Sequence, residues 1–96
     1  MPAYVIFLRD EMQDQAAYDH YLQLGVPTLA HFGGEILVAN GDHEAFEGPD
    51  FDGSVVLRFP DMASARAWYR SPEYEQFKTI RLGATTGRAV LLDGVN

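Results

Sequence analysis

The 96 residues of the chain are the length of one domain, residues 1–96, and its 47% hydrophobic residues can form a core without disulfide bonds or a structural metal. Because it contains no cysteine, it has no disulfide bond, no thiolate metal site and no thiol nucleophile. Its net charge of −7 argues against nucleic acid and anionic membranes as partners, since both attract basic surfaces.

The N-terminal part of the chain predicts a strand followed by a helix. The strand, Ala3–Arg9, is rich in β-branched and aromatic residues, and an acidic polar loop follows it. From Asp14, which we expect to cap the helix, apolar residues recur at helical spacing. Pro27 lacks a backbone donor, so we predict a bend or break near Gly25 and a last turn that ends at about His31.

The middle of the chain predicts two strands joined by a loop. The first is Glu35–Asn40, and Gly, Asp and Pro are scattered through the loop Gly41–Gly53 that follows. Within this loop, His43–Glu47 is a candidate short edge strand. The second main strand, Ser54–Phe59, stops at Pro60, which cannot donate a hydrogen bond to a sheet.

The C-terminal part predicts two consecutive helices and a strand. Asp61 caps the first helix, and Ser71 followed by Pro72 is the signal for a second N-terminus. We therefore expect a bend between two helices, the second of which ends at Gly83. The last predicted strand is Arg88–Leu92.

This order of elements favours the α+β class, because two strands follow each other without a helix between them. We predict a ferredoxin-like βαββαβ fold, an antiparallel sheet with the helices on one face. A sheet with one face in water alternates apolar and polar residues, but Tyr4, Ile6 and Leu8 are as apolar as their neighbours. We expect a second copy to cover this open face in a homodimer. The alternative is a monomer with an apolar surface.

Several segments resemble the domain of unknown function 1330 family over nearly the whole chain. They include AYVIFLRD, HFGGEILV and, above all, FPDMASARAWYRSPEYEQFKTIRLGATTGRAVLLDG, where the run from Trp68 to Tyr74 followed by Arg81 is the most specific signal. The resemblance implies a ferredoxin-like subunit that pairs face to face as a dimeric α+β barrel. It implies no reaction, since this architecture serves cofactor-free monooxygenases, small isomerases, haem enzymes and subunits without known chemistry.

Aromatic and arginine side chains are the candidates for ligand binding. A pocket can be lined by aromatic residues of both predicted helices, whose hydroxyls and indole would orient a mostly apolar ligand: Tyr18, Tyr21, Trp68, Tyr69 and Tyr74. The alternative is that they are ordinary core residues. Tyr74 has a further alternative, in which its hydroxyl reaches backbone at the helix bend. Arg81 follows the aromatic run, and its guanidinium can hold a ligand carboxylate or enolate. Its structural alternative is an ion pair that fixes the dimer.

His31 and Glu47 are candidates for acid–base catalysis. His31 closes the first predicted helix, where a cation is favoured by the helix dipole, and a half-solvated histidine at a helix end is the simpler explanation. The histidines show no metal-ligand spacing, so we predict no metal, and no phosphate loop or dinucleotide fingerprint is present. Arg58 lies within a strand and needs a partner, for which Glu35 and Glu47 are available.

The sequence therefore predicts a homodimer that binds or transforms a small organic molecule without a metal, nucleotide or other cofactor. We expect it in the cytoplasm, since no segment resembles a signal peptide or a spanning helix. As an enzyme it would carry out proton transfer or cofactor-free oxygen chemistry, like a monooxygenase or isomerase. Tyr18, His31 or Glu47 would then be acid or base, and Arg81 would stabilise an anion. The alternative is a non-catalytic ligand-binding or structural assembly subunit.

Overall fold

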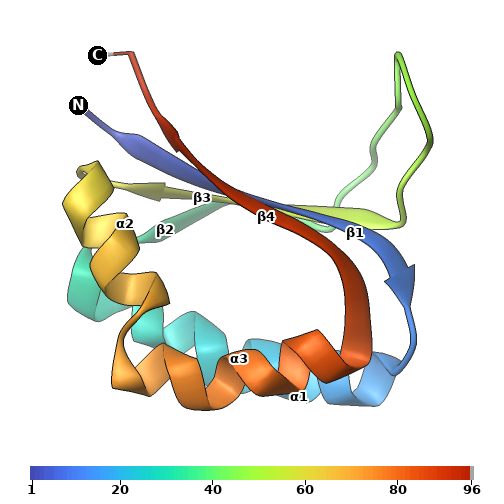
Figure 1. Cartoon of the computed structure of the whole chain (residues 1–96), viewed down its shortest axis with the longest axis horizontal. Helices are drawn as coiled ribbons and strands as arrows, with labels where there is room; N and C mark the ends of the chain where they lie inside the picture. Colours follow the sequence, from blue (N-terminus) through green and yellow to red (C-terminus); the bar gives the residue numbers. More distant parts are fainter. Residues whose placement is uncertain (96) are drawn as a thin grey trace.

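A four-stranded antiparallel sheet, covered by helices on one face, is the frame of the molecule (Figure 1). The computed structural model describes residues 1–95. The sheet has the order β2-β3-β1-β4, and its strands are β1 (Ala3–Met12), β2 (Glu35–Ala39), β3 (Gly53–Phe59) and β4 (Thr85–Asp93). The helices are α1 (Gln15–Gly25), the 3-10 helix η1 (Val26–Phe32), α2 (Met62–Tyr69) and α3 (Pro72–Ala84). The predicted ferredoxin-like α+β fold is confirmed.

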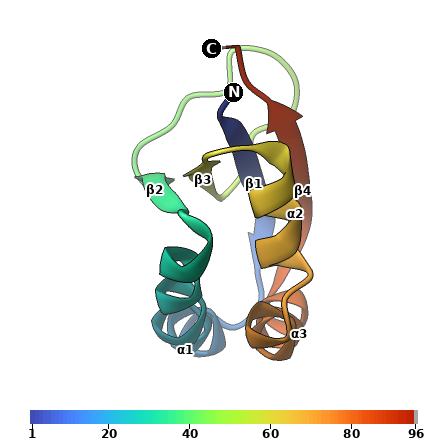
Figure 2. The same ribbon diagram turned by 90° about the vertical axis from the view of Figure 1, so that its left-hand side faces the viewer.

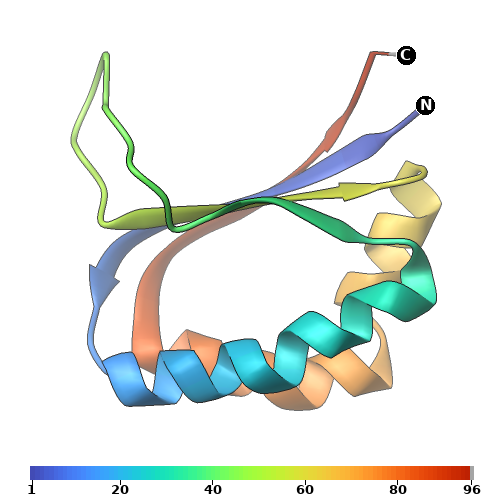
Figure 3. The same ribbon diagram turned by 180° about the vertical axis from the view of Figure 1, so that it is seen from behind.

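The two faces of the sheet differ in what covers them. Figures 2 and 3 show α1, α2 and α3 on the same side, with α1 beneath the β2 edge and α3 beneath the β4 edge. On that side Val5 packs between Leu57 of β3 and Leu91 of β4, its partners in the sheet. On the other side no element covers the sheet within residues 1–95, and Val90 and Leu92 are 46% and 48% exposed.

The helices begin where the sequence places their capping residues. Asp14 accepts a hydrogen bond from the Ala17 amide at 3.0 Å, and Asp61 accepts one from the Ser64 amide at 2.7 Å. Ser71 accepts from the Tyr74 amide at 3.2 Å, so α3 begins one residue after a true cap. The expected break occurs at Gly25, where α1 ends and the chain continues as the 3-10 helix η1.

The largest differences from the prediction concern two strand ends and one loop. The first strand extends to Met12, because residues beyond Arg9 pair with β4 through a bulge, and the last strand correspondingly begins at Thr85. The edge strand expected at His43–Glu47 is wrong, since these residues lie in the loop of residues 40–52 between β2 and β3. That loop is organised by side chains instead: the His43 ring stacks on Phe51 at 4.2 Å between ring centroids.

The core lies beneath β1 and β3 and is dominated by aromatic rings. Phe59, Trp68 and Tyr74 are the largest fully buried side chains, and the centroids of Trp68 and Tyr74 are 4.0 Å apart. The Trp68 indole donates to the Thr28 hydroxyl at 2.8 Å, which fixes α2 against η1. The side chains of Trp68, Tyr74 and Thr28 therefore pack together where α2, η1 and the start of α3 meet; we call this the closed end of the helix layer. In the described residues no helix has the length and apolarity that crossing a bilayer requires.

Candidate functional site

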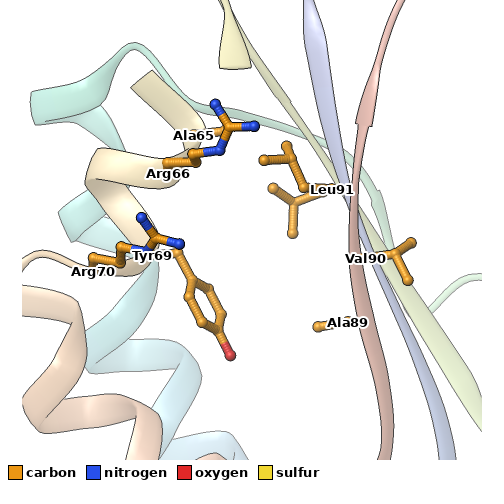
Figure 4. A pocket seen from close by; sticks show the side chains of 8 residues that line it. Ala65, Arg66, Tyr69, Arg70, Ala89, Val90 and Leu91 are labelled. Atoms are coloured by element: carbon orange, nitrogen blue, oxygen red, sulfur yellow. The ribbon is translucent and has the colours of Figure 1, made fainter. Parts of the chain in front are cut away.

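Two recesses lie between the helices and the β1–β4 side of the sheet. The larger, about 310 Å³, is at the C-terminal end of α3; we call it the Arg81 recess. The second, about 240 Å³, lies between α2 and β4; we call it the α2 recess (Figure 4). A third and smaller space of about 120 Å³ lies under β2 and β3 and is almost entirely apolar. All the charged side chains that line the three recesses therefore lie on the β4 side of the molecule.

A pair of hydrogen-bonded tyrosines lies in the core near Arg81. The hydroxyls of Tyr21 on α1 and Tyr74 on α3 are 2.6 Å apart, and both rings are buried. Burial raises the pKa of Tyr21 far above its usual range, and the Tyr74 hydroxyl adds to this rise. Burial also raises the pKa of Tyr74, although Arg81 and the hydrogen bond with Tyr21 work against it. Both phenols are therefore neutral donors or acceptors and not bases at ordinary pH.

Arg81 lies two helical turns beyond Tyr74 on α3 and brings a cation to the recess. Its guanidinium carbon is 5.0 Å from the centroid of the Phe7 ring, and its Nη2 is 3.5 Å from the Tyr69 hydroxyl. Its Nε is buried and has no hydrogen-bond partner among residues 1–95. Burial works to lower the pKa of Arg81, but the tyrosine oxygens around it produce a net rise, so the side chain stays charged.

No acidic side chain in residues 1–95 forms a salt bridge with Arg81. Arg9, which lines the same recess, differs in this respect, because its Nε is 2.8 Å from Asp52 and its Nη1 donates to Asn40 at 2.9 Å. A partly buried cation without a counter-ion is costly, and an anion placed beside it offsets that cost. The Arg81 recess is thus chemically suited to an anion.

Tyr18 forms part of the wall of the Arg81 recess. Its hydroxyl accepts a hydrogen bond from Asn40 at 3.1 Å, and the Arg9 guanidinium lies 4.9 Å from its ring centroid. The structure therefore brings the predicted Tyr18, Tyr69, Tyr74 and Arg81 into one region. Tyr18 and Arg81 line the Arg81 recess, Tyr69 lines the α2 recess, and Tyr74 lies behind them in the core.

The hydroxyl of Tyr74 has a different role from the one we considered at the helix bend. It reaches Tyr21 on another helix and not backbone, so the expected backbone contact is wrong. The physical reason is that the ring packs against Trp68 at an interplanar angle of 31° and its hydroxyl meets that of Tyr21 on α1. Tyr74 therefore ties α1 to α3.

His31 and Glu47 lie apart from this region. The His31 side chain is 67% exposed at the end of η1, and its Nδ1 is 3.0 Å from Glu73. Glu47 is exposed in the loop between β2 and β3, and neither residue lines any of the three recesses. Arg58 pairs with Glu35 at 3.0 Å, which decides between the two partners considered for it. In residues 1–95 no group of three His, Cys, Asp or Glu side chains is arranged to hold a metal.

Phe7 and Arg9 are the site residues that the sequence analysis missed. Both lie on the helix-covered face of β1, two residues apart, and both line the Arg81 recess. An available signal was the alternation of β1: a charged residue in step with Val5 and Phe7 must point beneath the helices. Thr85 and Thr86 at the start of β4 complete the recess and gave no such signal.

The comparison with protein families gives one match across nearly the whole chain. The model of the family described as domain of unknown function (DUF1330) matches residues 2–95. No curated protein matches significantly.

Solved structures share the fold at low sequence identity. A protein of unknown function from Rhodopseudomonas palustris has a TM-score of 0.80 and 19% identity, with coverage of 99% of this chain and 83% of that one. A dimeric ferredoxin-like protein of unknown function from Jannaschia sp. has a TM-score of 0.67 and 12% identity, and both chains are covered completely at 100%. A cofactor-independent oxygenase from Streptomyces nogalater has a TM-score of 0.59 and 14% identity, with 99% and 93% coverage. These identities support the fold alone.

Proposed function

This chain belongs to the DUF1330 family of domains of unknown function, and we propose that it binds a small organic anion in its Arg81 recess. The observation that carries the proposal is the charge of Arg81. It is a partly buried guanidinium with an unpartnered Nε, and it has no acidic partner in residues 1–95. A ligand carboxylate or enolate would supply charge-assisted hydrogen bonds to this group.

The walls of the recess define the body of the ligand. The Arg81 guanidinium lies over the Phe7 ring, and the Phe7 and Tyr18 rings line the same space, so the recess offers aromatic contact to the apolar part of a ligand. The volume of about 310 Å³ is near the lower end of the roughly 300–1,000 Å³ of small-molecule sites. A compact aromatic or lactone acid has these properties.

The catalytic form of the proposal is proton transfer on an enolisable molecule, with Arg81 stabilising the enolate oxygen. Cofactor-free oxygen chemistry on such an enolate is its extension, in keeping with the oxygenase of the same fold. The recess is lined by no carboxylate and no imidazole from residues 1–95, and Tyr21 and Tyr74 are neutral. The geometry thus favours recognition of a ligand that arrives as an anion over removal of its proton.

A structural assembly subunit is the second candidate. The observation in its favour is the closed end of the helix layer, where Trp68 and Tyr74 are buried and pack against each other. In that case Arg81 would only bind hydroxyls of its own chain. Ligand binding that depends on Arg81 separates the two functions.

The homodimer is also part of the proposal. Ile6 lies at the centre of the uncovered face, between Val56 on β3 and Val90 on β4. A second copy would remove this apolar surface from water, and the Jannaschia structure is a dimer with the same fold.

Sedimentation tests the homodimer, and we expect a mass of twice the 10.7 kDa of one chain. Ile6→Asp should sediment as one chain, whereas Ala67→Asp on the exposed side of α2 should not change the mass. A wild-type monomer at micromolar concentration would contradict the dimer.

Calorimetric titration with benzoate and benzamide tests the binding function. The two probes have the same shape, but only benzoate carries a charge. We expect benzoate to bind the wild type at least about tenfold more tightly than benzamide, which corresponds to about 1.4 kcal/mol. Arg81→Met should lose this preference without a large loss of stability, because it removes a partly buried cation that has no acidic partner in residues 1–95. The matched control is His31→Ala, which should bind like the wild type. Equal benzoate affinity of Arg81→Met and wild type would exclude the proposal.

A further inference from the structure

The basic residues that lack an acidic partner are gathered on one side of the molecule. Three of the seven basic side chains, Arg9, Arg58 and Lys78, form salt bridges within residues 1–95. The other four form none there, and all four line the two recesses beside β4: Arg66, Arg70, Arg81 and Arg88. In a chain of net charge −7, this concentrates unpaired positive charge where a small molecule can enter.

The α2 recess has an apolar floor and a basic rim. Arg66 and Arg70 are one helical turn apart on α2, and both border the recess. Figure 4 shows them with Tyr69 on the α2 side, across from Ala89 and Leu91 of β4. The lining therefore offers apolar contact to the body of a molecule and two guanidinium groups to one anionic end. Like the Arg81 recess, it combines an apolar surface with positively charged arginine side chains.

The two recesses lie one after the other along the same strands. Val5 faces Leu91 in the α2 recess, and two residues further along β1, Phe7 lines the Arg81 recess. Two residues of a strand span about 7 Å. Tyr69 joins the recesses, because it lines the first and its hydroxyl is 3.5 Å from Arg81 of the second. One molecule of modest length can thus contact both basic groups.

We infer that the α2 recess is a second anion subsite and that the natural ligand is an organic dicarboxylate with a short apolar body. One carboxylate binds Arg81, and the other binds Arg66 and Arg70 on α2. This inference rests on the proposed function, since it assumes that the first carboxylate binds Arg81. It adds the substrate class and two specificity-determining residues.

Terephthalate and 4-methylbenzoate are the probes that test it. They have the same ring and one shared carboxylate, and they differ in whether the opposite end is a second carboxylate or a methyl group. We expect the wild type to bind terephthalate at least tenfold more tightly by calorimetry. The double variant Arg66→Gln/Arg70→Gln should bind the two probes equally and should retain the wild-type affinity for 4-methylbenzoate.

A single-charge control separates a specific contact from the general field of the protein. Lys78→Gln removes one positive charge from α3 at a residue that lines neither recess. Arg70→Gln should lower the terephthalate affinity by at least threefold, and Lys78→Gln should change it by less than twofold. Equal losses in the two variants would overturn the inference, because the effect would then be long-range.

The remaining outcomes distinguish the inference from the function beneath it. If the wild type binds both probes equally and Arg81→Met binds neither, the second subsite is wrong and the Arg81 site stands. If Arg81→Met binds both probes like the wild type, the proposed function fails. Dependence on Arg66 and Arg70 in that second case would also refute the inference as stated, since it requires both ends to be held.

Discussion

The two ends of α3 pack in opposite ways although they belong to one helix. At its start, Tyr74 is fully buried, its ring lies against Trp68, and its hydroxyl has a partner in Tyr21. Two turns later, Arg81 is partly buried, has an unpartnered Nε and borders a recess. Buried polar groups in folded proteins are almost always satisfied. The difference therefore identifies the first end as core, and it is the reason that we propose the second end as the ligand site.

Removing the largest side chain of the closed end gives the largest expected effect. Trp68→Ala leaves a cavity beneath β3 and deprives the Thr28 hydroxyl of its donor. The free energy of unfolding should fall by about 3–5 kcal/mol, as for other buried aromatic residues. Urea denaturation followed by circular dichroism measures it. A loss below about 1 kcal/mol would mean that the closed end is not the stabilising core.

The tyrosine pair gives a smaller effect at the same end. Tyr74→Phe keeps the ring but leaves the Tyr21 hydroxyl buried without its partner. The free energy of unfolding should fall by about 1–3 kcal/mol, the cost of an unsatisfied buried group. Tyr21→Phe/Tyr74→Phe should recover part of this loss, because neither hydroxyl is then left alone. Benzoate affinity should stay within about twofold of wild type in both variants, if the pair belongs to the core.

Alkaline titration compares the same pair with the other tyrosines. The chain has five tyrosines, and burial raises the pKa of Tyr21 and Tyr74 above their value in the unfolded chain. A phenol that loses its proton less readily when folded stabilises the fold below the unfolded pKa of about 10 and loses that contribution as the pH rises above it. Tyrosinate absorbance of Tyr21 and Tyr74 should therefore appear only together with unfolding. In Tyr18→Phe/Tyr69→Phe, that late phase should remain; its absence would place the pair in contact with water.

The smallest effect is expected for His31, which lies at neither end of α3. His31→Ala removes an exposed contact with Glu73. The free energy of unfolding should change by less than about 0.5 kcal/mol, and benzoate affinity should not change. A loss of binding here would move the site from α3 to the end of η1.

The sequence predicted the helices, the sheet and the core around Trp68 better than it predicted the recess at the end of α3. Caps at Asp14, Asp61 and Ser71 are local signals, since each depends on a few neighbouring residues, and all three helices begin there. The strand expected at His43–Glu47 failed because pairing depends on distant backbone, and side-chain contacts organise that loop instead.

The candidate site was predictable only in part, for a related reason. Tyr69 was identifiable because it lies in the aromatic run from Trp68 to Tyr74, and Arg81 because it follows that run on the same predicted helix. The contact of Tyr21 with Tyr74 joins residues 53 positions apart, and only the fold brings them together. Arg9 was missed although the alternation of its strand places it under the helices. The absence of an acidic partner for Arg81 within residues 1–95 is likewise a property of the folded chain.

The most direct test of the Arg81 site is the NMR signal of the Arg81 Nε–H group, assigned by its loss in Arg81→Lys. Titration with benzoate should shift this signal with a saturable curve, because the carboxylate binds the guanidinium, whose Nε has no hydrogen-bond partner within residues 1–95. Benzamide at the same concentrations should leave it in place, and the Nε–H signals of Arg9 and Arg58, which are paired with acids, should not move. An Arg81 signal that ignores benzoate, or that responds equally to both molecules, would contradict an anion site at the open end of α3.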